Sequence, residues 1–375
     1  MRIFWVISDR LDTKVDKSTI IEMVYEIKKL GIEISVLAGY KEKRYVNDSR
    51  NFYPVYFKGI NFPFLYRISL LIKIMVYLYK NCKRNDIIIT HDTLLWMYAI
   101  LRMLKKVRIH YDLRTLPVDI HSLKEKFNHL ISWKLHNYLF KNVPDSYSFI
   151  TERIKKSMED AFKFKLKEKY CFWSSGVNLN ICVTNAKQKE NDYINLFYHG
   201  SITSNRGIGT LIKSVSLLSP DYNIKLIIVG DGKDLYEMKK LADSLEIIKK
   251  VEFLGFVLYE NIGQYISQAD ICVCPLPNRI EWNVSSPIKI FEYMAFGKPI
   301  ICTKIPAHYD ILGDLPFVVY SGEDEQSIAE AIKYTLKNLD KIKLYKKDEI
   351  EFVRENYTWE KQAYKLVSFF KLIYT

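Results

Sequence analysis

Two loops that follow predicted strands carry residues suited to holding an anion. After the apolar run at residues 194–198 the chain reads HGSITSNRGIGTLIKSV, in which Gly200 and Ser201 turn the chain and Arg206 follows. Glycine lets a backbone approach a ligand closely, and both a guanidinium and a helix start near Gly209 offer positive charge to a phosphate. The loop predicts a phosphate site, although an ordinary strand-to-helix connection with a surface arginine has the same pattern.

The segment WNVSSPIKIFEYMAFGKPIIC, residues 282–302, predicts a second helix start. We expect Ser286 as the N-cap and Pro287 at the first helical position, with the helix running to Phe296. The backbone amides of Ile288 and Lys289 then stay free of helical partners and form a second anion cradle.

Glu292 lies one helical turn after Ile288, on a similar face. A carboxylate there accepts hydrogen bonds from a vicinal diol such as a ribose. The alternative is an amphipathic helix with one solvated glutamate. Two glycine turns lie between these segments, Gly230-Asp231-Gly232 and Gly255-Phe256-Val257, and each by itself is also compatible with a plain turn.

These loops need strands that deliver them to one edge of a sheet. Short apolar runs alternate with helix-period segments, which predicts right-handed crossover units, parallel sheets and ligands beyond the carboxyl ends of the strands. Because 375 residues exceed what one core usually organises, we expect two doubly wound α/β domains facing across a cleft. The expected strands lie at residues 3–7, 34–37, 87–90, 107–111, 148–150, 194–198, 224–229, 251–254, 271–274, 299–302 and 317–320.

Charge divides the chain at the polar segment TNAKQKEND, residues 184–192, which we predict to be a linker. Residues 1–190 hold 34 Lys and Arg against 19 Asp and Glu, whereas residues 191–375 hold 22 against 24. The basic half should therefore face an anionic partner. The chain has no zinc finger, basic zipper or RNA-binding signature, so we expect no nucleic-acid partner.

The segment from residue 62 to 84 favours an anionic membrane surface as that partner. On a helical wheel Lys73, Lys80, Lys83 and Arg84 fall within about a third of the circumference, and apolar residues cover much of the rest. This pattern is typical of a helix lying in a membrane interface. The alternative is a buried helix whose lysines reach solvent.

Cysteine usage and apolar run lengths indicate the compartment. The six cysteines lack paired-ligand spacing, so we expect neither disulfides nor a zinc site, and a reducing environment. The first residues lack the pattern of a secretion signal. The longest apolar stretch, residues 68–79, is shorter than the roughly 20 residues of a spanning helix. We therefore expect a cytoplasmic protein, peripheral on the inner face of the plasma membrane.

In their combined order these motifs resemble the retaining glycosyltransferases of family 4, which have the GT-B fold of two facing Rossmann-like domains. The similar segments are FYHGSITSNRGIGTLI, LIIVGDGKD, VEFLGFV, ADICVCPLP, SSPIKIFEYMAFGKPII and NYTWEKQAYKL. The resemblance implies an acceptor-binding domain over residues 1–185 and a nucleotide-sugar-binding domain over residues 191–355. It also implies a final helix over residues 356–375 that crosses back to the first domain.

The resemblance assigns donor-site roles by similarity. The phosphates would be held by Gly200, Ser201, Arg206, Ser286, Pro287, Ile288 and Lys289. Phe256 and Val257 would border the base, and Glu292 would bind the ribose.

Two departures from the family pattern concern charged residues of the donor site. Ser201 stands near the start of the phosphate loop, where many members carry Lys or Arg, so the phosphate charge rests more heavily on Arg206 and Lys289. Val284 stands eight residues before Glu292, where the family often has a second glutamate, and Glu281 is our candidate substitute.

In the first half, Asp112 and Arg114 are our candidates for the reacting centre. We rank His110 lower because we expect it on the opposite face of its strand. A strand-end aspartate that caps the next segment is the alternative for Asp112.

The resemblance implies sugar transfer from a nucleotide-diphosphate sugar to a hydroxyl of a glycan or lipid-linked acceptor, with retention, in bacterial surface polysaccharide synthesis. Arg206 and Lys289 would neutralise the departing diphosphate, beside Asp112 and Arg114. No Asp-x-Asp motif is present, so we expect no metal and no cofactor. The alternatives are an inactive nucleotide-binding scaffold of a polysaccharide assembly complex, a sugar-nucleotide epimerase and, with less support, a phosphorylase.

Overall fold

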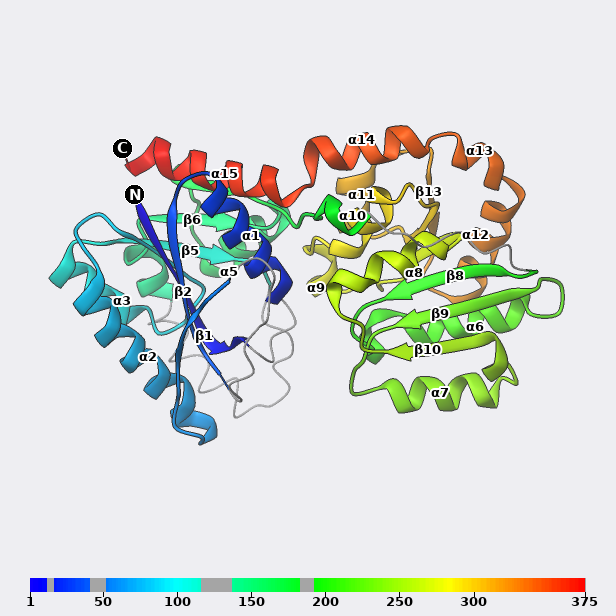
Figure 1. The fold of residues 1–375 in the computed structure, drawn as a ribbon, viewed down its shortest axis with the longest axis horizontal. Helices are drawn as coiled ribbons and strands as arrows, with labels where there is room; N and C mark the ends of the chain where they lie inside the picture. Colours follow the sequence, from blue (N-terminus) through cyan, green and yellow to red (C-terminus); the bar gives the residue numbers. More distant parts are fainter. Residues whose placement is uncertain (12–16, 41–51, 116–136, 183–191, 375) are drawn as a thin grey trace. The chain divides into compact units, whose positions relative to one another are not determined.

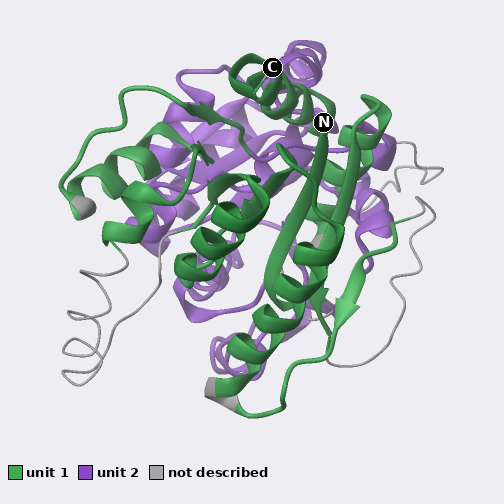
Figure 2. Ribbon diagram, turned by 90° about the vertical axis from the view of Figure 1, so that its left-hand side faces the viewer, with its two compact units in different colours: residues 1–174, 359–375 green, residues 175–358 purple. Residues whose placement is uncertain are grey.

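The computed structural model describes residues 1–11, 17–40, 52–115, 137–182 and 192–374 (Figure 1). The chain forms two compact units, which Figure 2 colours separately. Unit 1 contains Met1–Ser174 and Trp359–Thr375, and unit 2 contains Ser175–Thr358. The predicted linker lies outside the described residues except for its last residue, Asp192.

Unit 1 is built on a parallel sheet of seven strands in the order β3-β2-β1-β4-β5-β6-β7. Its strands are β1 (Arg2–Arg10), β2 (Glu33–Gly39), β3 (Val55–Phe57), β4 (Ile87–Thr90), β5 (Arg108–Leu113), β6 (Ser146–Phe149) and β7 (Tyr170–Phe172). Its helices are α1 (Lys17–Lys29), α2 (Pro63–Asn81), α3 (Leu95–Lys105), α5 (Glu152–Phe162) and α15 (Trp359–Tyr374).

Unit 2 is built on a parallel sheet of six strands in the order β10-β9-β8-β11-β12-β13. Its strands are β8 (Ile194–His199), β9 (Ile224–Val229), β10 (Val251–Gly255), β11 (Ile271–Cys274), β12 (Ile300–Thr303) and β13 (Val318–Ser321). Its helices are α6 (Ile208–Leu218), α7 (Leu235–Ser244), α8 (Ile262–Gln268), α9 (Ile280–Asn283), α10 (Ile288–Ala295), α11 (Pro306–Leu312), α12 (Glu325–Lys337), α13 (Leu339–Lys343) and α14 (Lys346–Asn356). The described residues also form the 3₁₀ turns η2 (Leu179–Cys182), η3 (Ser204–Arg206), η4 (Ile248–Lys250) and η5 (Tyr259–Asn261), and residues 137–142 are helical.

The predicted strands and the α/β class are confirmed. Each apolar run named above corresponds to one strand, and the strands pair in parallel in both sheets. Runs such as IIIT in β4 and ICVC in β11 are buried along their whole length, as expected where helices cover both faces of a sheet. The sequence-based prediction missed β3 and β7, the two edge strands of the first sheet.

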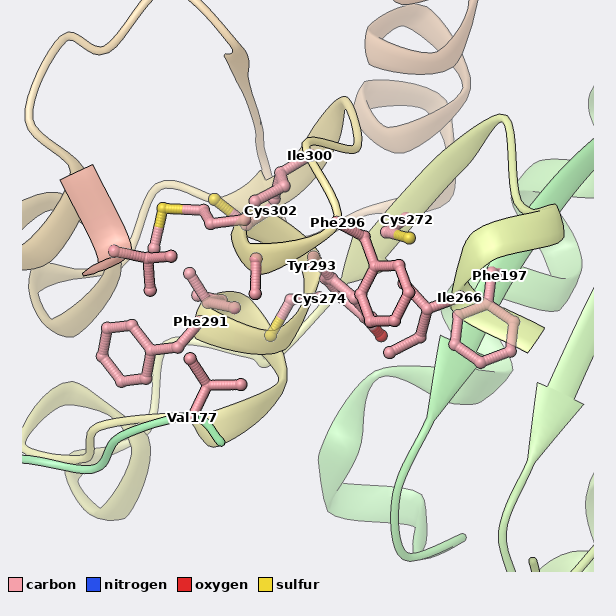
Figure 3. Close-up of a cluster of buried hydrophobic side chains, with 14 of the residues drawn as sticks. Val177, Phe197, Ile266, Cys272, Cys274, Phe291, Tyr293, Phe296, Ile300 and Cys302 are labelled. Carbon is pink, nitrogen blue, oxygen red and sulfur yellow. The ribbon is translucent and has the colours of Figure 1, made fainter. Parts of the chain in front are cut away.

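Alternating side chains of the second sheet feed two separate cores. On one face, Leu196 and Val273 join the core beneath α6 and α12. On the other face, Phe197, Cys272 and Cys302 pack against α10, whose Phe291 and Tyr293 are fully buried (Figure 3). This packing fixes α10 against β8, β11 and β12, so the start of α10 has a defined position at the sheet edge.

The final helix, α15, belongs to unit 1. Its Phe370 ring meets the His110 ring edge-on, with centroids 4.7 Å apart, and Gln362 accepts a hydrogen bond of 2.8 Å from the Ser174 amide. Within the described part of the chain, no helix combines the length and apolar character that crossing a membrane requires.

Candidate functional site

Strand order determines where a site can form in unit 2. The chain leaves β8 and β11, the two neighbouring central strands, in opposite directions along the sheet, since β8 connects to β9 and β11 to β12. Such a switch point leaves an opening beyond the carboxyl ends of the two strands. His199 ends β8, and Gly200 and Ser201 follow it at this edge.

Three loop glycines let backbones touch beside this opening. A Cβ atom at Gly207 would overlap the carbonyl oxygen of Pro275, and one at Gly230 would overlap that of Gly200. A Cβ at Gly232 would overlap the carbonyl oxygen of Ile202. The glycine turns after β8 and β9 are therefore packed against neighbouring main chain, which sets the path of the loop that carries Ser201 and Arg206.

Arg206 ends the 3₁₀ turn η3, and Gly207, with φ +74°, leads into α6. The helix thus begins at Ile208, one residue before the predicted Gly209. The Arg206 guanidinium carbon lies 4.7 Å from the centre of the Trp282 ring, while the Trp282 indole donates a 2.8 Å hydrogen bond to the Asn205 carbonyl. Trp282 therefore stacks on Arg206 and holds its loop, and no carboxylate partner of Arg206 appears among the described residues.

Lys289 lies in the first turn of α10 and is 7% exposed. Its Nζ lies 4.0 Å from the centre of the Tyr198 ring and next to Gly200. Within the described residues this buried ammonium has no hydrogen-bond acceptor. An unpaired buried charge is costly, so the position is suited to an anionic ligand.

Lys289 and Arg206 both act electrostatically on Cys274, the last residue of β11. Burial raises the pKa of the Cys274 thiol, and the nearby charges of Lys289 and Arg206 act in the opposite direction. The structure therefore brings Gly200, Arg206 and Lys289 to the same corner of unit 2.

The predicted helix cap requires a correction. Pro287, not Ser286, takes the cap position, with φ −72° and ψ 113°, and the helix begins at Ile288. The extended backbone of Pro287 delays the helix by one residue. Ser286 instead bonds to Ser175: its hydroxyl accepts from the Ser175 amide at 3.3 Å, and its carbonyl accepts from the Ser175 hydroxyl at 2.7 Å. The first-turn amides of Ile288 and Lys289 precede the first helical bond, from the Ile290 amide to the Pro287 carbonyl.

Glu292 has a partner that the motifs did not suggest. Its carboxylate lies 2.6 Å from the Nε2 atom of His199 and is almost completely buried. The His199 ring also meets the Tyr293 ring edge-on at 5.3 Å, and its Nδ1 atom has no hydrogen-bond partner within the described residues. In the sequence, the signal that could have pointed to His199 is its place at the end of a predicted strand, immediately before a glycine turn.

The remaining predicted donor-site residues lie on other loops of unit 2. Phe256 follows Gly255 and is 74% exposed, whereas the next residue, Val257, packs against the core that contains α10. Glu281 lies in α9 and is half-buried. Val284 is buried, and as a valine it offers no carboxylate at this position. The described residues contain no group of three or more His, Cys, Asp or Glu placed to hold a metal ion.

Asp112 and Arg114 lie in unit 1, and both contact Trp173. Asp112 is 4% exposed, and its Oδ1 accepts hydrogen bonds from the Trp173 indole at 3.0 Å and from the Ser148 hydroxyl. The Arg114 guanidinium stacks 3.5 Å from the centre of the Trp173 ring and donates to the Trp173 carbonyl. Nothing in the sequence indicated Trp173, which contacts both residues.

The expected orientation of His110 is wrong. His110 and Asp112 both bond to the Ser148 hydroxyl, so they share one face of β5. Residues two apart in a strand point to the same side, which excludes the opposite-face prediction. Burial lowers the pKa of His110 to about 3, and its second nitrogen bonds to Ser146, whose hydroxyl also bonds to Tyr374.

The region of the chain that matches a known protein family lies within unit 2. Residues 184–349 match the family model of the group 1 glycosyl transferases. An uncharacterized glycosyltransferase of Methanocaldococcus jannaschii is 25% identical over 180 residues, which cover 47% of this chain and 44% of that protein. The O-antigen biosynthesis glycosyltransferase WclY of Escherichia coli is 21% identical over 229 residues, covering 54% and 62%. The chain thus spans about half the length of these curated relatives.

A solved structure extends the likeness to both units. HepE of Anabaena, determined in complex with UDP, is 14% identical and superposes with a TM-score of 0.77 over 100% of both chains. The identity is low, so this likeness concerns the fold. The chain therefore has the α/β GT-B fold, and its second unit carries the region that matches the group 1 glycosyl transferases.

Proposed function

We propose that this protein transfers a glycosyl group from a nucleotide-diphosphate sugar to a hydroxyl of a glycan or lipid-linked acceptor, in the synthesis of a bacterial surface polysaccharide. The observation that carries the proposal is the buried, acceptor-free ammonium of Lys289 beside Gly200 and near Arg206. A diphosphate supplies the charge and the oxygen acceptors that this ammonium lacks. The family match of residues 184–349 and the UDP in the HepE complex support the same ligand class.

The proposed chemistry needs cations more than it needs a strong nucleophile. The bond between the anomeric carbon and the phosphate oxygen breaks, and negative charge grows on the departing diphosphate. Arg206, Lys289 and the amides at the start of α10 would stabilise that charge. The acceptor oxygen then bonds to the anomeric carbon, and its proton passes to the departing phosphate oxygen. Retention of configuration and independence from metal ions are parts of this proposal.

In the proposed donor site, the ribose lies at Glu292. One oxygen of this carboxylate bonds to His199, and a ribose hydroxyl would donate to the carboxylate as well. Phe256 and Val257 would border the base, and the Gly200-Ser201 turn would contact the phosphates. Asp112 and Arg114 remain proposed members of the reacting centre, with Asp112 acting as a buried acceptor held by Trp173 and Ser148.

The test is UDP binding by isothermal titration calorimetry in the wild type and in Lys289→Met, which removes the charge but keeps the length of the side chain. Charge-assisted hydrogen bonds contribute about 1.5–3 kcal/mol, so we expect binding to weaken by about ten-fold or more. The control is Lys213→Met, at an exposed lysine of α6. Equal affinity in all three proteins would refute the phosphate assignment.

A matching turnover experiment tests the reaction itself. Candidate nucleotide sugars are incubated with acceptor glycans in the presence of EDTA, and the anomeric configuration of the product is read by NMR. With EDTA present, we expect transfer that retains the anomeric configuration. An inverted product would contradict the proposed retention, and a strict metal requirement would contradict the proposed independence from metal ions.

Val284 favours a second candidate function. This buried valine stands where the family pattern often has a glutamate. Loss of that acid is compatible with a scaffold that binds a nucleotide and performs no transfer. A scaffold would bind UDP through Lys289 but would neither transfer nor hydrolyse any donor.

A further inference from the structure

Helix α2 exposes an apolar face as well as burying one. Leu70, Leu71, Ile74 and Leu78 are fully buried against the sheet of unit 1. The opposite side of the helix carries a second apolar stripe at three- and four-residue spacing, in which each side chain is between 42% and 51% exposed: Leu65, Ile68, Ile72, Val76 and Tyr79. A helix that is apolar on both sides normally has both sides covered.

Helix α3 lies beside α2 and repeats the pattern (Figure 1). Its outward side chains Trp96, Ile100, Met103 and Leu104 are between 46% and 79% exposed. The Lys105 ammonium of α3 lies 4.6 Å from the centre of the Tyr79 ring of α2, which joins the two stripes. We call the exposed stripes of α2 and α3 together the α2–α3 face.

The segment of the sequence that contains α2 and α3 is strongly basic. Residues 51–110 contain ten basic and two acidic side chains. Both acids are buried: Asp86 pairs with Arg2 at 2.6 Å, and Asp92 lies 3.7 Å from Arg67. No carboxylate from these residues is therefore exposed near the face. Four exposed cations have no carboxylate partner within the described residues: Lys80, Lys83, Arg84 and Lys106.

Charge and composition together determine the kind of partner. A second copy of this face would bring like charges together across a two-fold axis, which opposes self-association. An anionic bilayer instead offers an apolar layer for the stripes and negative headgroups for the surrounding cations. Trp96 and Tyr79 are residue types that favour the boundary between the two layers.

We propose that the α2–α3 face docks unit 1 onto an anionic lipid bilayer. The apolar stripes enter the boundary of the acyl chains, while Lys80, Lys83, Arg84 and Lys106 contact the headgroups. Neither helix crosses the bilayer. The inference rests on unit 1 alone, so it stands or fails independently of the proposed transfer, and it would place the protein where a lipid-linked acceptor is found.

The test is flotation with vesicles of phosphatidylcholine alone or of phosphatidylcholine mixed with phosphatidylglycerol. We expect binding to the mixed vesicles and its loss at high salt, because screening weakens headgroup attraction. Each juxtamembrane cation contributes about a five-fold gain in partition. The triple variant Lys80→Gln/Lys83→Gln/Arg84→Gln should therefore bind about 100-fold more weakly. The control Lys233→Gln/Lys240→Gln/Lys249→Gln removes the same charge from exposed positions of unit 2 and should bind like the wild type.

The apolar part is tested by Ile72→Gln/Met103→Gln, with Leu344→Gln as the control at an 80% exposed leucine of unit 2. Brominated lipid should quench tryptophan fluorescence in the wild type and less in Trp96→Phe. Binding of UDP measured by calorimetry should not change in any of these variants. Equal flotation of both charge variants, or equal binding of the wild type to neutral vesicles, would overturn the proposal. So would a dimer in the wild type that Ile72→Gln/Met103→Gln dissociates, because a second copy would then cover the face.

Discussion

At the scale of single residues, the pair formed by Glu292 and His199 links stability to ligand binding. Glu292 is 2% exposed and lies in the middle of α10, so its carboxylate needs a donor. His199 supplies one from the end of β8, at 2.6 Å. The bond also orients the carboxylate that we propose for the ribose. His199 is therefore a positioning residue, acting through Glu292.

We expect His199→Ala to lower the free energy of unfolding by about 1–3 kcal/mol, because it leaves a buried acceptor without its donor. The variant should also bind UDP more weakly than the wild type. His199→Gln places an amide donor near the position of Nε2 and should recover most of both losses. Urea denaturation and calorimetry measure the two effects. Wild-type UDP affinity in His199→Ala would show that the pair is structural only.

Residue types and spacing predicted the cationic part of the site but not its partners. Arg206 and Lys289 follow from glycine turns and a helix start that are visible in the sequence. His199 was missed because its contact spans 93 positions and depends on which face of α10 meets β8. Ser286 was assigned as a cap from residue preference alone, whereas its hydroxyl bonds to Ser175, more than 100 residues away.

At the scale of elements, two separate features of the structure require a glycine at the start of α6. Gly207 has φ +74°, which favours glycine, and a Cβ there would overlap the Pro275 carbonyl. Gly255 has nearly the same backbone, φ +72°, but open space around it. The two positions therefore separate backbone strain from steric overlap within one unit.

We expect Gly255→Ala to cost about 1–2 kcal/mol, the usual penalty of the left-handed conformation. Gly207→Ala should cost clearly more, because main chain must also move. Its loop carries Arg206, so UDP binding should weaken as well. Urea denaturation compares the two variants. Equal destabilisation would mean that the loop after β8 can shift at no energetic cost, which would contradict the close contact between Gly207 and the Pro275 carbonyl.

Elements with long apolar runs were predictable, and short edge strands were not. Strand β4 carries four consecutive apolar or β-branched residues, and β9 carries five in six positions, interrupted by the half-buried Lys225. Strand β3 has three half-buried residues, and β7, Tyr170–Phe172, has none that is fully buried. An edge strand is stabilised by pairing with its single neighbour, which no local pattern reports.

At the scale of the whole molecule, the described residues of each unit include one fully buried histidine. Burial lowers the pKa of His110 in unit 1 to about 3 and that of His308 in unit 2 to about 4, from an ordinary value of 6.5. His308 donates from Nδ1 to the Thr303 carbonyl at 2.8 Å, and both nitrogens of His110 bond to serine hydroxyls. Each imidazole is therefore held in its uncharged form by its surroundings.

These two groups predict a loss of stability in mild acid. Below pH 6.5 each of these histidines binds a proton in the unfolded chain but stays neutral in the folded chain. The free energy of unfolding therefore falls as the pH falls toward the folded pKa values. The contribution is fully present above pH 6.5. Each histidine should remove about 1.5 kcal/mol between pH 6.5 and 5.

Urea denaturation at a series of pH values measures this loss in the wild type, in His110→Gln and in His308→Gln. Both variants should be less stable than the wild type near neutrality, because glutamine fits neither set of contacts fully. Their loss on acidification should nevertheless be smaller, His110→Gln flattening the transition of unit 1 and His308→Gln that of unit 2. Parallel pH curves for all three proteins would mean that other groups bind the protons and that these imidazoles titrate alike in the folded and unfolded chains.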